Sequence, residues 1–142
     1  MIVLDTDLIS LMQRGHSPAT ERLLEMHNRA RMHEPVQTTV ITYEEQIRGW
    51  FKVLSEARTV ADLISAYERL RLHAEYYGTH KLIDFDDAAA VEFQRLRGLK
   101  IRISTSDLKI AAITLARQAT LWTRNLRDFK QVPGLSVTDP TT

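Results

Sequence analysis

A short apolar run that ends in an acidic residue is the feature of this chain that most restricts its fold. The sequence opens MIVLDTDLIS, in which the apolar residues 2–4 lead directly to Asp5. Such a run, rich in β-branched residues, suits a strand buried on both faces, as in a parallel sheet. Asp5 then lies at the sheet edge where open α/β folds bind their ligands. A carboxylate beside a core needs a partner such as a divalent cation, unless Asp5 or Thr6 simply caps the following helix.

Segments typical of strands and of helices alternate along the remaining chain. Further strands are expected at 36–41, 81–85, 101–103, 120–123 and 135–138. Helices are expected after Ser17, over a hairpin at 42–77 that ends at Gly78, over 88–97 and from near Asp107, with a turn at 124–130. The alternation predicts a single domain over residues 1–142, with a three-layer α/β/α architecture and a mainly parallel central sheet of about five strands.

Composition narrows the possible chemistry. Of the 142 residues, 44% are apolar and 26% are charged, which is ordinary for one globular domain. The net charge of +1 favours no class of partner, and the absence of cysteine excludes disulfides, thiolate zinc sites and cysteine nucleophiles. The five histidines lack the paired spacing of metal ligands. With no basic leader and no apolar run of membrane-spanning length, a cytoplasmic location is expected.

Acidic side chains recur just beyond the predicted strands. Asp5, Glu45 and Asp107 occupy such positions, and so does the pair Asn125 and Asp128 near the end of the chain. Because parallel strands share one carboxyl edge, these residues are expected to converge. Carboxylates gathered in one cleft raise each other's pKa values unless divalent cations neutralise them. Their oxygens suit Mg²⁺ or Mn²⁺, which also bind phosphate oxygens, so the implied chemistry is hydrolysis of a phosphodiester.

Each of these residues also has a simpler structural interpretation. Glu45 stands three residues after Thr42, as in a capping box. Asp107 lies where an acid complements a helix dipole, and Asn125 with Asp128 has the spacing of a helix cap. These interpretations do not explain why the residues share one sheet edge, or why so apolar a helix follows Asp107.

Several motifs, taken in order, resemble those of the PIN-domain ribonucleases. They read IVLDTDLIS, TTVITYEEQIRGW, STSDLKIAAITLA, ATLWTRNLRDF and VPGLSV, and only the hairpin between Phe51 and Lys81 lacks matching residues. The resemblance is greatest to the VapC-type toxins of bacterial toxin–antitoxin pairs. It implies a PIN-like fold, RNA cleavage with Mg²⁺ or Mn²⁺, a homodimer, and a small VapB-like antitoxin that occupies the cleft.

The resemblance also assigns roles to individual residues. Asp5, Glu45 and Asp107 match the metal-binding acids of the family. The fourth acidic position of many relatives falls at Asn125, where this chain has an amide, and Asp128 is near enough to substitute. The amide weakens the case for a second, fully occupied metal site.

Other side chains near these motifs are expected to serve the substrate. Thr6 and Thr123 are expected to donate hydroxyl hydrogen bonds to the carboxylates or to the water shell of the metal. RNA also requires cationic contacts to its phosphates, for which Arg14, Arg124 and Arg127 are the candidates. A basic run lies close by at Arg95, Arg97, Lys100 and Arg102.

Two helical segments carry more apolar surface than the sheet can cover. The apolar faces of 17–30 and 42–77 exceed what one small sheet needs, which predicts an exposed groove for the antitoxin, a dimer contact, or both.

Haloacid dehalogenase-like phosphatases also begin with D-x-D, but they need an acid where this chain has Ala111. A PIN fold that binds RNA or a protein without cleaving RNA is the stronger alternative, and the amide at Asn125 favours it. Metal-dependent cleavage of RNA distinguishes the nuclease from both.

Overall fold

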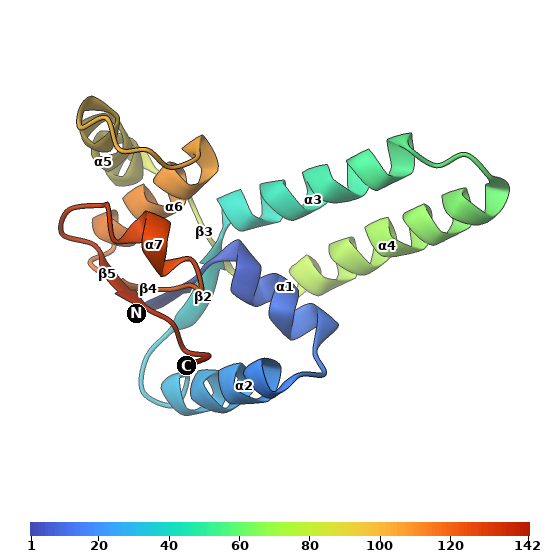
Figure 1. Ribbon diagram of the computed structural model, residues 1–142, viewed down its shortest axis with the longest axis horizontal. Coiled ribbons are helices and arrows are strands. Elements are labelled where there is room, and N and C mark those ends of the chain that lie inside the picture. The colour runs from blue at the N-terminus through green and yellow to red at the C-terminus, as the bar shows by residue number, and fades with distance from the viewer.

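A sheet of five parallel strands forms the centre of the computed structural model, which describes residues 1–142 (Figure 1). The strands are β1 (Ile2–Leu4), β2 (Val36–Thr39), β3 (Leu82–Ile83), β4 (Thr120–Trp122) and β5 (Ser136–Thr138). Their order is β3-β2-β1-β4-β5, so the first strand of the chain lies in the middle. Leu4 pairs with Thr38 of β2 and with Trp122 of β4, so the residues that follow these strands meet at one edge.

Seven helices surround this sheet. They are α1 (Thr6–Arg14), α2 (Pro18–Ala30), α3 (Val40–Ser55), α4 (Val60–Gly78), α5 (Asp87–Gly98), α6 (Thr105–Ala116) and α7 (Leu126–Phe129). The expected caps at Ser17 and Thr59 are confirmed, since each side chain accepts a backbone N–H from the first turn of its helix. None of the helices has both the length and the apolar character needed to cross a membrane.

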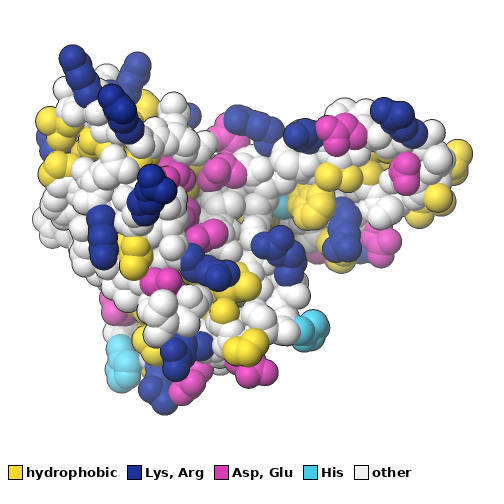
Figure 2. All heavy atoms as spheres, viewed as in Figure 1, with side chains coloured by type: hydrophobic (Ala, Val, Ile, Leu, Met, Phe, Trp, Pro, Cys, Tyr) yellow, Lys and Arg dark blue, Asp and Glu magenta, His cyan; other side chains and the backbone are white.

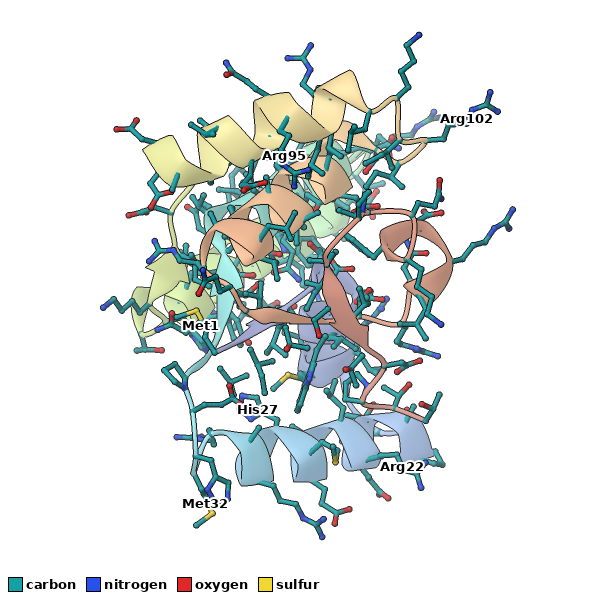
Figure 3. All side chains as sticks on the ribbon, turned by 90° about the vertical axis from the view of Figure 1, so that its left-hand side faces the viewer. Met1, Arg22, His27, Met32, Arg95 and Arg102 are labelled. Atoms are coloured by element: carbon teal, nitrogen blue, oxygen red, sulfur yellow. The ribbon has the colours of Figure 1, made fainter.

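Helices cover both faces of the sheet. Val3 belongs to the larger core cluster, which α5 and α6 build on one face, whereas Ile2 and Leu4 pack with α1 and α2 on the other. Figure 3 shows α2 on one side and α5 and α6 on the other, with His27 pointing from α2 toward the sheet. This arrangement confirms the three-layer α/β/α architecture with a parallel sheet, and it explains why β1 is apolar on both faces.

The hairpin of α3 and α4 extends away from the sheet (Figure 1). Along α4, only Ala66, His73 and Tyr77 are buried. Large apolar side chains are exposed on the hairpin at Phe51, Val53, Val60, Leu63, Ile64, Tyr67 and Leu72. The expected excess of apolar helical surface is therefore present in the single chain.

The predicted strand at 101–103 is wrong. Ile101 and Ile103 lie in the connection between α5 and α6, where they pack against the larger core and pair with no strand. Lys100 has a φ of 55°, in the left-handed region, and this conformation turns the chain after α5. The apolar alternation of this segment therefore serves packing and not a sheet ladder.

Smaller differences concern where elements begin and end. The second strand stops at Thr39 and not at Ile41, because Thr39 caps α3 by accepting the backbone N–H of Thr42 at 3.2 Å. The third strand covers only Leu82–Ile83. The segment 124–130, expected to be a turn, contains the short helix α7.

Candidate active site

The carboxyl edge of the sheet gathers side chains from distant parts of the sequence. Asp5 follows β1 and caps α1, while Thr123 follows β4. Helix α3 continues from β2 and carries Glu45, and Asp107 lies in the first turn of α6. Figure 2 shows Asp and Glu side chains concentrated in the middle of this face, beside the base of the hairpin, with Lys and Arg side chains around them.

Asp5 lies at the centre of this edge, with only 5% of its surface exposed. Its Oδ1 accepts the backbone N–H of Thr6 at 2.8 Å, and its Oδ2 accepts the hydroxyl of Thr123 at 2.7 Å. Burial, followed by the charge of Asp7, raises the pKa of Asp5 to about 7, although both hydrogen bonds oppose the shift. Helix capping therefore accounts for one of the two carboxylate oxygens, and the position of Thr123 is as expected for a hydroxyl donor.

Asp7 is a residue of this site that the sequence pattern did not reveal. Its Oδ2 accepts the backbone N–H of Arg124 at 3.0 Å, and its Oδ1 is buried without a hydrogen-bond partner. Burial raises the pKa of Asp7, and the hydrogen bond from Arg124 opposes this increase. The only signal in the sequence is the second aspartate of the DTD motif, because the groups around it come from the far end of the chain.

Glu45 is oriented by α1 and not by the start of its own helix. The hydroxyl of Thr6 donates to Oε1 of Glu45 at 2.7 Å and lies 2.9 Å from the hydroxyl of Thr42. The capping-box interpretation of Glu45 is wrong, because Thr39 is the cap and Thr42 lies inside α3. Thr6 thus contacts a carboxylate, as expected for a hydroxyl donor.

Asp107 is close enough to the other acids for their charges to act on it. Burial raises the pKa of Asp107, and the charges of Glu45, Asp128 and Asp7 raise it further. Its own charge contributes in turn to the raised pKa of Asp5. The expected convergence of acids from separate segments is therefore present in the fold.

Asn125 and Asp128 are linked to each other. The Nδ2 of Asn125 donates to Oδ2 of Asp128 at 3.0 Å, and the backbone N–H of Asn125 donates to the hydroxyl of Thr123, also at 3.0 Å. Asn125 occupies the N-cap position of α7, as the cap interpretation has it, but its side chain makes no capping bond. The amide instead orients the Asp128 carboxylate, and Thr123 connects this loop to Asp5.

The donor set has the chemistry of a site for a hard divalent cation. It combines carboxylates that raise one another's pKa with a buried carboxylate oxygen, on Asp7, that has no partner. In this conformation, no three His, Cys, Asp or Glu side chains form a metal-binding group. The fit to Mg²⁺ or Mn²⁺ is thus one of donor type and charge, and not of a preformed coordination shell.

Two of the three candidate arginines lie beside these acids. Arg14 and Arg124 line a cavity of about 490 Å³ together with Asp7 and Asn125. Both arginines are exposed and form no ion pair within the chain. Arg127 is exposed on α7 and does not line this cavity.

The basic run, which begins in the last turn of α5 and continues into the connection to α6, lies at the same end of the molecule as Asp107. Arg117, which follows α6, pairs with Asp86, the cap of α5, at 3.3 Å, so the two helices are antiparallel. The C-terminal end of α5 is therefore near the start of α6. Figure 3 shows Arg102 pointing outward from this end.

Comparison with known proteins gives structural neighbours only. No family model matches the sequence, and no curated protein matches it. The DNA-bound VapBC from Salmonella typhimurium has a TM-score of 0.76 at 22% identity, covering 98% of this chain and 97% of the other. For VapBC2 from Rickettsia felis, bound to a promoter DNA fragment, the TM-score is 0.71 at 22% identity, with coverages of 97% and 98%. VapBC-5 from Mycobacterium tuberculosis is 26% identical with a TM-score of 0.56, over 96% and 94%.

These neighbours are matched over nearly the full length of both chains. The similarity extends through the hairpin, which lacked signature residues in the sequence. It confirms the resemblance to VapC-type toxins at the level of the fold. The chain has the α/β PIN-like fold found in VapBC toxin–antitoxin structures.

Proposed function

We propose that this chain is a metal-dependent endoribonuclease that acts as the toxin of a toxin–antitoxin pair. The observation that carries the proposal is the convergence of carboxylates from α1, α3 and α6 around the buried Asp5, whose pKa is raised to about 7. Such a cluster is costly for a fold unless a cation neutralises it. Its place at the carboxyl edge of a parallel sheet is where α/β folds bind ligands.

Asp5, Glu45 and Asp107 are the residues that would hold Mg²⁺ or Mn²⁺, with Asp7 beside them. When bound, the cation would lower the pKa of a water molecule and stabilise the charge that develops on the phosphate. The hydroxyls of Thr6 and Thr123 hold the carboxylates of Glu45 and Asp5 in place.

Contacts to the RNA backbone are proposed for the two arginines that lie beside the acids. Arg14 and Arg124 have no ion-pair partner in the chain, which leaves both guanidinium groups available for phosphates. Arg127 is exposed nearby on α7 and is proposed as a peripheral phosphate contact.

A small antitoxin and a second copy of the chain are the proposed protein partners. The exposed apolar side chains of the α3–α4 hairpin support this part of the proposal, because monomeric proteins rarely leave so much contiguous apolar surface uncovered. The neighbours in VapBC and FitAB complexes provide a precedent for an antitoxin partner.

The nuclease assignment is tested by Asp107→Asn, with Asp84→Asn as the matched control at an exposed acid outside the cluster. Loss of a metal ligand should reduce Mn²⁺-dependent cleavage of single-stranded RNA by more than the ~10–100-fold typical of outer-shell partners. The control should cleave at the parental rate. Parental activity in Asp107→Asn, with added EDTA having no effect, would show that the site is assigned wrongly.

A PIN-fold module that binds RNA or a protein without cleavage is the second candidate. Asn125 favours it, because this amide replaces an acid and takes up one oxygen of Asp128. RNA binding that persists without metal-dependent cleavage would support the inert module. The structure does not support the phosphatase alternative, because Ala111 is fully buried and provides no second acid.

A further inference from the structure

A cleft leads from the acidic cluster into the base of the hairpin. One cavity of about 670 Å³ is lined by Thr6 and Glu45 at its acidic end and by Trp50 and Arg69 farther along. A second cavity of about 280 Å³ shares Gln13, Trp50 and Arg69 with the first. The two cavities therefore adjoin at these side chains, and together they form what we call the hairpin cleft, between α1, α3 and α4.

The lining of the hairpin cleft combines apolar side chains, such as Val53 and Leu72, with aromatic, polar and cationic ones. Trp50 forms part of the wall in both cavities, and Gln13 presents an amide. Arg14 and Arg69 are exposed and have no ion-pair partner in the chain. The only acid in the lining is Glu45, at the mouth. An aromatic face with unpaired guanidinium and amide groups is a lining that suits an unstacked nucleobase and its phosphates.

His73 adds an unsatisfied polar group to the inner end of the cleft. Its side chain lines the second cavity and is 4% exposed, yet neither ring nitrogen has a hydrogen-bond partner. The ring packs in a cluster with Tyr43 and Tyr77, at centroid distances of 5.0 and 4.8 Å. Burial lowers the pKa of His73, so the neutral imidazole offers one donor and one acceptor. Both nitrogens are buried, so in this structure they face the protein interior and not the open part of the cleft.

The hairpin cleft is open and its wall is already ordered. Gln46 donates to Ser10 at 3.1 Å and to Gln13 at 3.0 Å, and it accepts the hydroxyl of Tyr77, so one side chain links all three helices. Gly49 lines the cleft, and a Cβ added there would meet no atom within 4 Å. The missing side chain therefore leaves room that a larger residue would fill without distorting the helix.

We propose that the hairpin cleft holds one unpaired base of the RNA, stacked on Trp50, while the adjoining phosphate lies at the acidic cluster. This inference rests on the proposed nuclease function and adds a subsite for substrate selection. The unpaired guanidinium groups of Arg14 and Arg69, beside the face of Trp50, suit the phosphates and base of a nucleotide, whereas the more exposed apolar residues farther out on the hairpin suit a protein segment. A base inside a duplex cannot enter, so the subsite selects single-stranded RNA.

The test measures RNA binding in EDTA, where no metal-dependent cleavage occurs. The probes are a short unstructured RNA and the same RNA annealed to its complement. Trp50→Ala removes the stacking face, and Gly49→Leu fills the cleft. Gly98→Leu is the matched control, at a helical glycine in α5 with equally open surroundings. Trp50→Phe keeps a stacking face but removes one of the two tryptophans.

Single-stranded RNA should quench Trp50 fluorescence in the parent and in Gly98→Leu, and the duplex should not. Trp122, which is 6% exposed, should contribute little to the change. Trp50→Ala and Gly49→Leu should each weaken single-strand binding by ~5–100-fold. Trp50→Phe should bind nearly as well as the parent while losing the quench.

Unchanged dissociation constants in Trp50→Ala and Gly49→Leu would overturn the proposal, and so would equal quenching by the duplex. Quenching by an amphipathic helical peptide but not by RNA would assign the cleft to a protein. If Gly49→Leu cleaves RNA like the parent, the cleft assignment fails and the nuclease stands. If the parent never cleaves RNA but the binding pattern is as expected, the nuclease fails and the base subsite stands.

Discussion

A carboxyl group in the position of Asp5 reduces the stability of the metal-free protein at neutral pH. Its pKa of about 7 in the folded chain exceeds the ordinary value of 3.8, so between these values the folded state binds more protons than the unfolded state. The free energy of unfolding therefore falls as pH rises through this window, with a limiting slope of about 1.4 kcal/mol per pH unit from this one group. Acidic pH restores the stability that ionisation removes.

Asp5→Asn keeps the shape of the side chain and removes its charge. We expect its free energy of unfolding, measured by urea titration in EDTA, to vary less between about pH 5 and pH 8 than that of the parent. At the upper pH the variant should be more stable than the parent, and if the proposed function holds it should also lack nuclease activity. Asp84→Asn, at an exposed position, should keep the parental pH dependence. A parental slope in Asp5→Asn would contradict the raised pKa.

His73 is a second residue whose environment costs stability. Both ring nitrogens are buried without a partner, and an unsatisfied buried polar group costs about 1–3 kcal/mol. His73→Phe keeps a ring between Tyr43 and Tyr77 and removes the polar atoms. We expect the melting temperature to rise by about 2–4 °C, which corresponds to roughly 1 kcal/mol. His33→Phe, at an exposed histidine, should leave the melting temperature nearly unchanged. A lower melting temperature in His73→Phe than in the parent would show that the His73 ring has a hydrogen-bond partner.

At the level of elements, the α3–α4 hairpin carries apolar side chains that the rest of the chain leaves exposed. The side chain of Ile64 is 66% exposed and that of Val60 is 74% exposed. Helical hairpins of a single chain normally bury one apolar stripe against their own core. Here part of that stripe projects beyond the core, so its burial requires a partner.

Ile64→Glu places a charge on this surface. The free energy of unfolding should change by less than ~0.5 kcal/mol, because the residue is exposed on α4. Capture of the small antitoxin from the adjoining reading frame, measured by co-expression and co-purification, should be lost. Ser65→Glu adds the same charge on another face of the helix and should retain the partner. Equal capture of the antitoxin by both variants would show that this face of the hairpin is not part of the interface.

The elements themselves were largely visible in the sequence. The caps at Ser17 and Thr59 and the β-branched run at residues 2–4 act through near neighbours, and they fall where expected. The strand prediction for 101–103 was wrong because alternating apolar residues occur in a packed connection as well as in a strand. Strand existence depends on a free neighbouring edge, which the local pattern does not encode.

For the whole molecule, the proposed cation site predicts that stability depends on divalent cations. A cation that binds only the folded state stabilises it by RT ln(1 + [L]/Kd), about 2.7 kcal/mol at 100 times Kd. Mn²⁺ should therefore raise the melting temperature, and EDTA should reverse the change. KCl at equal ionic strength should not reproduce it. Asp107→Asn should show a much smaller Mn²⁺ effect, and a shift equal to that of the parent would place the cation elsewhere.

The sequence by itself determined the fold class, most helices, and the position of Asp5 at the end of a strand, because these follow from local periodicity and strand polarity. Asp107 follows a connection that forms no strand and Glu45 lies inside α3, so strand polarity alone does not place these two acids. Only the tertiary structure decided how deeply Asp5 is buried, that Asp7 joins the site, and that Thr39 and not Thr42 caps α3. These features arise from groups distant in sequence, as where the hydroxyl of Thr123 meets Asp5 across 118 positions. Local sequence patterns do not specify such long-range contacts, because the register of the sheet determines them.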